Sequence, residues 1–146
     1  MQEVTTDIWS YLGQAMIAIT TNGSRTADGR AILGRGVARQ AEARFPGLRT
    51  RLGELLQTGG NHVHDIGFGL VSFPVEESPW SLPDLRLIAR SATELRDLAD
   101  QRQWQRIVVP RPGCGGGGLH WIEVRPLLCS HFDERFIVVA APGHEI

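Results

Sequence analysis

The amino-acid sequence predicts an α/β layered domain with a mostly parallel core sheet. Short apolar segments typical of buried strands alternate along the chain with longer segments of helical periodicity. Strands that are separated by helices of this length usually pair in parallel. The chain has 146 residues and shows no internal repeat and no linker between two halves. We therefore expect residues 1–146 to form a single domain.

The first half of the chain predicts one strand and then two helices. The apolar segment Gln14–Thr20 is expected to form a buried strand, because the turn-forming pair Asn22-Gly23 follows it. Apolar residues at helical spacing predict a helix over Gly36–Phe45, which Pro46-Gly47 ends. A second short helix is expected over Leu48–Gln57.

The middle of the chain predicts a pair of strands and the longest helix. His62–Ile66 and Gly69–Phe73 are expected to be strands around a glycine turn at Gly67. Asp84–Gln101 has apolar residues at steps of three and four, and Pro83 precedes its first turn. This pattern is the clearest helical signal in the sequence.

The last part of the chain repeats the alternation of strand and helix. Arg106–Pro110 is expected to be a buried strand, a glycine-rich loop follows it, and a helix is expected near Trp121–Leu128. Phe136–Ala141 is expected to be the last strand. In parallel sheets of this kind, ligands bind beyond the carboxyl ends of the strands.

Composition and charge exclude several kinds of function. All 15 basic residues are arginine, which excludes Schiff-base chemistry and a P-loop lysine. Arginine cannot replace lysine as a general base, because it stays protonated in proteins. The formal net charge of -1 gives no overall attraction to nucleic acid. No apolar run approaches the roughly 20 residues that span a bilayer, and two cysteines make no disulfide framework; we therefore expect a cytoplasmic protein.

The most informative segment is the glycine-rich stretch from Pro110 to Trp121. Its five glycines lower stability through backbone entropy, so close approach of a ligand to the backbone explains them better than packing does. The stretch leads from a strand end into a helix start, where free backbone N–H groups and the helix dipole favour an anion. We interpret it as a diphosphate-binding loop. The alternative is a flexible surface loop, which the apolar residues on both sides disfavour.

A second glycine-bearing stretch, Gly29 to Ala38, contains the motif Gly34-Arg35-Gly36 and also leads into a helix. Alone it is weak, because it lacks the full spacing of a dinucleotide-binding fingerprint. Two such loops at one edge of a sheet suit an extended ligand that contains a ribose and a pyrophosphate.

Three motifs in this order resemble the macrodomain family: Thr20 to Gly23, Gly34 to Ala38, and Pro110 to Trp121. The resemblance runs from Asp7-Ile8 to the last strand. It is greatest to the branch that includes the terminal ADP-ribose hydrolase and the antitoxin of DNA-ADP-ribosylating toxins. It implies a three-layer α/β/α macrodomain-like sandwich, with a mixed, mostly parallel central sheet, that binds ADP-ribose in a cleft across the strand ends. No cofactor and no metal ion are expected.

The resemblance also implies roles for individual residues. Asp7 would accept a hydrogen bond from the adenine amino group, Ile8 follows it in the same motif, and Asn22 would bind the hydroxyls of the distal ribose. The other implied contacts come from the two glycine-bearing loops: Gly34, Gly36 and Val37 around the distal ribose and nearer phosphate, and Gly113, Cys114, Gly115, Gly116, Gly117, Gly118 and Leu119 around the diphosphate.

Two positions depart from the hydrolase pattern. Where the terminal ADP-ribose hydrolase has a lysine after a Phe-Pro pair, this chain has Glu76, and where it has an aspartate in the diphosphate loop, this chain has Gly117. Hydrolysis would need a different route, such as a water held against the anomeric carbon with help from a ligand phosphate or a nearby carboxylate such as Asp28 or Glu76. The candidate catalytic residues are therefore Asn22, Asp28 and Glu76. Asp28 can instead be a solvated turn residue, and Glu76 a surface charge at a strand end.

Three function classes follow from these observations. We expect a protein that binds ADP-ribose and hydrolyses ADP-ribosyl modifications by a water-based route. The alternatives are a non-catalytic ADP-ribose reader or metabolite binder, and a phosphatase that acts on ADP-ribose 1″-phosphate. The expected partner is ADP-ribose or an ADP-ribosylated macromolecule, nucleic acid enters only as a modified substrate, no membrane is involved, and the protein is expected to be a monomer.

Overall fold

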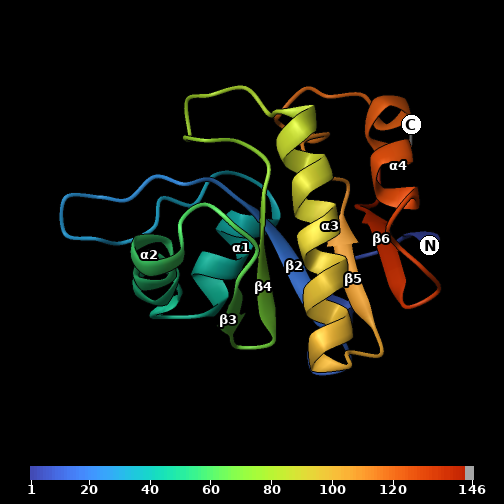
Figure 1. The fold of residues 1–146 in the computed structure, drawn as a ribbon, viewed down its shortest axis with the longest axis horizontal. Coiled ribbons are helices and arrows are strands. Elements are labelled where there is room, and N and C mark those ends of the chain that lie inside the picture. Colours follow the sequence, from blue (N-terminus) through green and yellow to red (C-terminus); the bar gives the residue numbers. More distant parts are fainter. Residues whose placement is uncertain (144–146) are drawn as a thin grey trace.

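A computed structural model describes residues 1–143 and contains one six-stranded sheet (Figure 1). The strands lie in the order β1-β6-β5-β2-β4-β3. Every neighbouring pair is parallel except β3 and β4, so the sheet is mixed and mostly parallel, as predicted. The strands are β1 (Gln2–Thr5), β2 (Met16–Thr21), β3 (Asp65–Gly67), β4 (Leu70–Pro74), β5 (Ile107–Pro110) and β6 (Phe136–Ala140).

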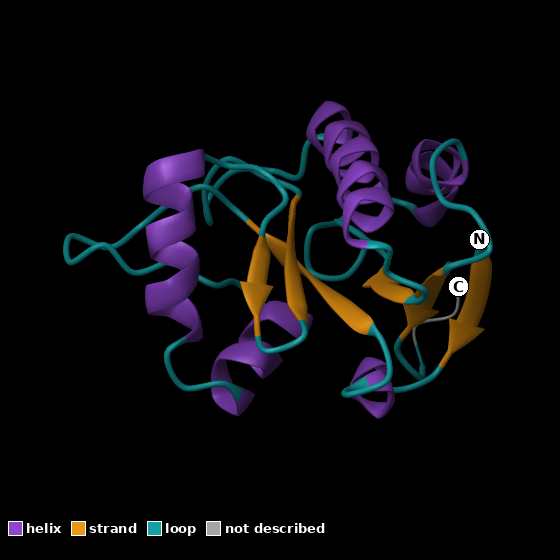
Figure 2. Cartoon of the chain, turned by 60° about the horizontal axis from the view of Figure 1, so that its bottom comes forward, coloured by secondary structure: helices purple, strands orange, loops and turns teal. Residues whose placement is uncertain are grey.

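Helices cover both faces of the sheet and make three layers (Figure 2). One core, which includes Phe73, Leu95 and Val124, joins one face of the sheet to α3 and α4. The other core, which includes Ile19 and Leu52, joins the opposite face to α1, α2 and the short helix η1. The helices are η1 (Ile8–Tyr11), α1 (Val37–Arg44), α2 (Leu48–Gly59), α3 (Leu85–Arg102) and α4 (Trp121–Cys129). No helix among residues 1–143 is both long and apolar enough to cross a membrane.

The predicted helices and strands are all present, and one strand end is shifted for a clear reason. β3 begins at Asp65 and not at His62, and the preceding residues have side-chain partners on α3 and β4 in place of regular strand pairing. The Nδ1 atom of His62 lies 2.7 Å from Oε2 of Glu94, and the backbone N–H of Val63 donates to Oε1 of the same side chain at 2.9 Å. The segment stays attached to β4 through Ser72, whose N–H donates to the His64 carbonyl at 2.9 Å and whose hydroxyl accepts from the His64 N–H at 2.8 Å. β1 and η1 were not predicted.

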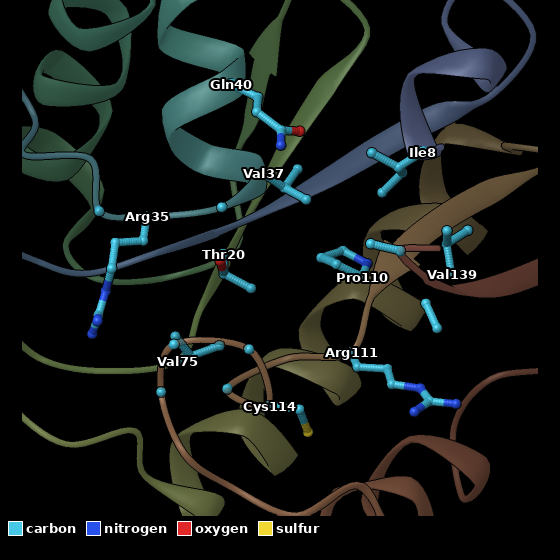
Figure 3. Close-up of a pocket in the computed structure, with 18 of the residues that line it drawn as sticks. Ile8, Thr20, Arg35, Val37, Gln40, Val75, Pro110, Arg111, Cys114 and Val139 are labelled. Carbon is cyan, nitrogen blue, oxygen red and sulfur yellow. The ribbon is translucent and has the colours of Figure 1, made fainter. Parts of the chain in front are cut away.

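The carboxyl ends of five parallel strands meet at one edge of the sheet. Thr20 on β2, Pro110 on β5 and Val139 on β6 lie around the open space at this edge (Figure 3). The sheet order places the end of β1 on one side of this space and the end of β4 on the other. Four strand spacings separate those two ends, which is roughly 19 Å.

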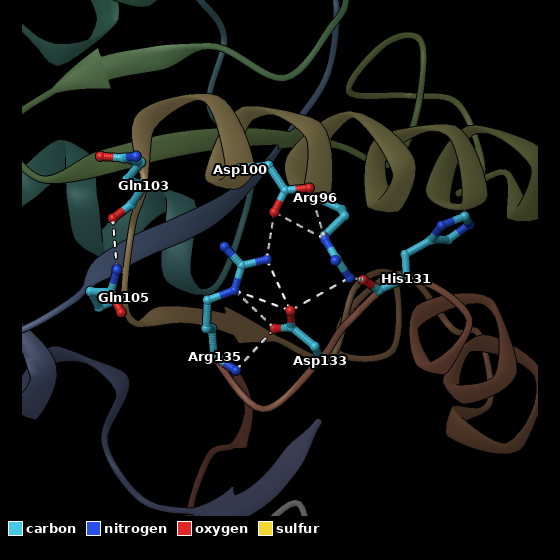
Figure 4. A network of polar contacts seen from close by, with 7 residues as sticks. All are labelled: Arg96, Asp100, Gln103, Gln105, His131, Asp133 and Arg135. Atoms are coloured by element: carbon cyan, nitrogen blue, oxygen red, sulfur yellow. Dashed lines mark hydrogen bonds and ion pairs between the residues drawn. The ribbon is translucent and has the colours of Figure 1, made fainter.

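At the opposite edge, an ion-pair network fastens the end of α3 to the loop before β6 (Figure 4). The Nη2 atom of Arg135 lies 2.6 Å from Oδ1 of Asp100 and 2.9 Å from Oδ2 of Asp133. Arg96 donates to the carbonyl of His131 at 3.0 Å and also contacts Asp100. Hydrogen bonds from Arg135 hold the pKa of both carboxyl groups below the ordinary value.

We expect Asp133→Asn to lower the free energy of unfolding by about 1 kcal/mol at neutral pH, since the network is partly exposed. Because the pKa of Asp133 is lower in the folded state, its stabilisation is complete above the unfolded value of about 4 and is lost as the pH falls through the folded value. The difference between wild type and variant should therefore shrink in acid. Urea unfolding at pH 7 and at about pH 3 measures it. Asp97→Asn, an exposed position of α3, is the matched control, and equal losses in the two variants would contradict this role for the network.

Candidate functional site

A cleft of about 1120 Å³ lies at the carboxyl edge of the sheet. Its walls are the segments that follow β1, β2, β4, β5 and β6. This is the place at which a parallel α/β sheet binds ligands, because the connections to the helices diverge there. The volume suits a ligand larger than a mononucleotide.

Most residues that the sequence assigned to ligand contact line this cleft. They are Asp7, Ile8, Asn22, Gly34, Gly36, Val37, Gly113, Cys114, Gly115, Gly116, Gly117 and Leu119. Glu76 lines it from the segment after β4. Gly118 belongs to the same loop as Gly117 but does not line the cleft, and Asp28 lies outside it.

Two walls of the cleft offer backbone N–H groups to an anion. In the described part of the chain, the N–H groups of Gly115, Gly116 and Gly117, which line the cleft, have no hydrogen-bond acceptor, while the loop closes through a bond from the Leu119 N–H to the Gly113 carbonyl at 3.0 Å. Across the cleft, α1 begins after Gly36, which has φ +66° and no capping side chain. The first N–H groups of that helix are therefore also open. These donors can hold phosphate oxygens from two sides.

Glu76 is a half-buried carboxylate with no fixed partner. Its side chain forms no hydrogen bond or ion pair with any residue in the range 1–143, and burial raises its pKa, against the opposing effect of the Arg35 charge. The backbone around it is held firmly: Asn61 donates to the Glu76 carbonyl at 3.2 Å, and the Gly23 N–H donates to the Glu77 carbonyl at 3.1 Å. A carboxylate in this state can accept a proton from a ligand or a water.

Asn22 is only 3% exposed, and its side-chain amide holds the loop that follows β2. Its Nδ2 donates to the carbonyl of Ile32 at 2.8 Å, and its Oδ1 accepts from the N–H of Ser24 at 3.0 Å. One N–H and one lone pair remain, because an amide group offers two donor hydrogens and two acceptor lone pairs. Asn22 can thus position the loop and bind a hydroxyl at the same time.

The loop after β2 explains the position of Asp28. Residues 25–31 form a hairpin with a bridge between Arg25 and Ala31, and Ala31 exchanges hydrogen bonds with Arg49 on α2. The hairpin therefore runs beside α2 and away from the cleft (Figure 1). The Asp28 side chain is 62% exposed, pairs with Arg30 at 3.0 Å, and has a pKa lowered by hydrogen bonds from Thr26 and Arg30. Asp28 is therefore a solvated turn residue, which was the alternative interpretation of this position.

At the opposite end of the cleft, the expected residue Asp7 lies near Trp9, Gln40 and Arg44, which no sequence motif indicated. Asp7 caps η1 by accepting from the N–H of Trp9 at 3.1 Å. Trp9 donates from its ring nitrogen to Gln40 at 2.7 Å, and the guanidinium of Arg44 lies 4.8 Å from the centre of its ring. On the other wall, Arg111 stacks on a second tryptophan at 5.0 Å. In the sequence, these residues are marked only by lying close to the proposed binding motifs. Closeness in sequence does not distinguish a tryptophan of the core from one that lines a cleft.

Cys114 belongs to the glycine-rich loop after β5 and lines the cleft. Burial raises the pKa of the Cys114 thiol to about 11, so it is protonated at neutral pH and is a poor nucleophile. Within residues 1–143, no group of three or more histidine, cysteine, aspartate or glutamate side chains is arranged to hold a metal ion.

Comparison with known proteins gives structural neighbours but no sequence relatives. No protein-family model matches the chain, and no curated protein matches it significantly. The macrodomain of Mycobacterium tuberculosis DarG superposes with a TM-score of 0.74 at 21% identity, covering 95% of this chain and 98% of the other. The macrodomain of Thermus aquaticus DarG superposes with a TM-score of 0.78 at 19% identity, covering 97% of each chain. The chain has a macrodomain fold.

A third neighbour with this macrodomain fold was solved with a ligand. Thermosipho africanus DarTG in complex with ADP-ribose superposes with a TM-score of 0.76 at 16% identity. All of this chain is covered in that comparison, but it spans only 43% of the other. These identities establish a shared fold, and the contents of the cleft must be argued from this chain's own residues.

Proposed function

We propose that the cleft binds ADP-ribose and hydrolyses ADP-ribosyl linkages, with Glu76 as the base that activates water. The observation that carries the proposal is the half-buried Glu76 carboxylate, which no described residue pairs, at the β4 end of a cleft whose two walls present open backbone N–H groups. The ADP-ribose in Thermosipho africanus DarTG supports the choice of ligand.

The order of the strands suggests how the ligand lies. Asp7 follows β1 at one end of the cleft, where its second carboxylate oxygen can accept from an adenine amino group. The diphosphate lies between Gly115 to Gly118 and the open start of α1, and the distal ribose lies beside Asn22 and Glu76. The roughly 19 Å between the two ends suits an extended ligand.

The chemical step uses water and the Glu76 carboxylate. Glu76 takes a proton from a water whose oxygen forms a bond to the anomeric carbon of the distal ribose, while the bond from that carbon to the acceptor group breaks. The acceptor leaves with a proton from Glu76 or from solvent. Asn22 holds the ribose hydroxyls, which fixes the anomeric carbon in front of the water. Asp28 takes no part in this proposal.

The proposal treats the chain as a single ADP-ribose-binding domain that acts as a monomer on ADP-ribosylated macromolecules. We place the protein in the cytoplasm, which the two unpaired cysteines support.

Titration calorimetry with ADP-ribose, AMP and NAD tests the ligand, and incubation with ADP-ribosylated protein and DNA tests turnover. We expect selective binding of ADP-ribose and release of ADP-ribose from at least one substrate. Selective binding without turnover would replace the hydrolase with a reader. Absence of ADP-ribose binding would overturn the assignment of the cleft.

We expect Asn22→Ala to weaken ADP-ribose binding by roughly 1–3 kcal/mol, because the variant loses its hydrogen bonds to the ribose and the anchor of the loop after β2. Calorimetry on folded protein measures this loss. Asp28→Asn, which changes a polar residue of the same loop outside the cleft, should leave the affinity unchanged. Unchanged affinity in Asn22→Ala would show that the ribose does not lie there.

A further inference from the structure

Arg35 stands on a short glycine-flanked segment at the entrance to α1. Gly36 has φ +66°, a conformation that glycine adopts readily, and no atom lies within 4 Å of the Cβ position of either Gly34 or Gly36. The Cβ positions of both glycines therefore face open space. Arg35, which lies between them, is exposed and lines the cleft. Its backbone leaves room for the side chain to move.

The guanidinium of Arg35 reaches the diphosphate loop on the other wall. A Cβ atom built on Gly116 would lie 2.9 Å from Cζ of Arg35 and 3.0 Å from its Nε, so the side chain lies directly against this glycine. Figure 3 shows Arg35 extending from the loop before α1. The side chain thus reaches from the segment before α1 to Gly116, whose N–H group has no acceptor in the described part of the chain.

The Arg35 cation has no fixed partner among residues 1–143. It forms no hydrogen bond or ion pair there, whereas Arg44 stacks on Trp9 and Arg111 stacks on Trp121. Its charge acts on Glu76, which follows β4. Since Asp7 follows β1 at the other end of the sheet, Arg35 lies on the side of the cleft away from Asp7.

We propose that Arg35 closes over the second phosphate of a diphosphate ligand and makes the cleft select diphosphates over monophosphates. The inference rests on the proposed direction of the ligand, with adenine beside Asp7. The phosphate nearest Arg35 is then the one that ADP-ribose and ADP possess and AMP lacks. A guanidinium pairs well with phosphate because its donors match two oxygens at once. The Arg35 guanidinium, which lies against Gly116, adds its side-chain donors to the backbone N–H groups of that loop, and together they surround the phosphate.

Calorimetric titration of ADP-ribose, ADP and AMP into wild type, Arg35→Gln, Arg35→Lys and Arg39→Gln tests this inference. Arg39→Gln removes the same charge four residues further along, at an exposed position of α1 outside the cleft. We expect Arg35→Gln to lower the affinity for ADP-ribose and for ADP by about 10- to 100-fold, and to lower the affinity for AMP far less. Arg35→Lys should fall in between, because it keeps the charge but not the paired donors. Arg39→Gln should match wild type.

The outcomes separate this inference from the proposed function. Wild type that binds ADP-ribose, together with an Arg35→Gln variant that still prefers ADP to AMP, overturns the role of Arg35 alone. An equal loss of affinity for ADP and AMP in Arg35→Gln also overturns this role, since Arg35 would then attract any phosphate by its charge. Wild type that binds ADP over AMP but not ADP-ribose, with the preference lost in Arg35→Gln, supports Arg35 and overturns the proposed function. Wild type that binds none of the three ligands overturns both.

Discussion

Glu76→Gln is expected to lower turnover of an ADP-ribosylated substrate by roughly 10²- to 10⁴-fold, the usual contribution of a general base. Glutamine keeps the size and polarity of the side chain but cannot accept a proton at neutral pH. Because the backbone of the segment is held by Asn61 and Gly23, its position should not change. Affinity for ADP-ribose should stay close to that of wild type. Single-turnover release of ADP-ribose, paired with calorimetry, measures the two effects separately.

The pH dependence of turnover gives a second test of Glu76. Burial raises its pKa, and the Arg35 charge opposes this only in part. The active form is the carboxylate, so the rate should fall as the pH drops through a midpoint above the ordinary glutamate value of about 4.3.

The raised pKa of Glu76 also means that folding disfavours the charged form of its side chain. Glu76→Gln removes that penalty, which is present above the folded pKa, and should not lower the melting temperature at pH 7.

Glu77→Gln is the matched control for this experiment. Glu77 is the next residue, is exposed, and does not line the cleft. Its variant should keep wild-type turnover. If Glu76→Gln retains turnover within a factor of ten, or if Glu77→Gln loses as much, the assignment of the base to Glu76 is wrong.

The sequence predicted the strands that form continuous apolar runs, and it missed the edge strand β1 and the short helix η1. β2, β4, β5 and β6 are almost wholly buried, which produces continuous apolar runs. β1 is an edge strand of Gln, Glu, Val and Thr with no fully buried residue, and it joins the sheet through backbone pairing with β6. Backbone pairing leaves no pattern in the side chains.

The site shows the same division between local and long-range causes. The two glycine-bearing loops line the cleft as expected, because the end of β5 and the starts of α1 and α4 fix their positions. Asp28 could not be placed in the same way. The direction of its hairpin depends on hydrogen bonds between Ala31 and Arg49, which are distant in sequence. The contact of Arg35 with Gly116 is still longer in range, and a glycine gives no sign of what packs against it.

Gly117→Asp is expected to weaken the binding of ADP-ribose and to produce no gain of activity. The resemblance to the terminal ADP-ribose hydrolase leads one to expect an aspartate here, so this variant asks whether that arrangement fits the present loop. A Cβ atom on Gly117 would lie 2.6 Å from the backbone oxygen of Gly113 and 2.6 Å from Cγ of Pro83. Neither atom belongs to a flexible side chain, so the loop must open. We expect an affinity loss of roughly 5- to 150-fold, since such strain typically costs 1–3 kcal/mol.

Two alanine variants separate loop geometry from the added charge. Gly117→Ala meets the same two atoms and should lose affinity nearly as much as Gly117→Asp, whereas at Gly115 a Cβ has no atom within 4 Å. Gly115→Ala should therefore keep the wild-type melting temperature and lose less affinity. The explanation fails if Gly117→Ala binds ADP-ribose as wild type does. If Gly117→Asp binds well and hydrolyses faster, the loop can accept an aspartate, and packing against Pro83 is not the reason that this chain has glycine at position 117.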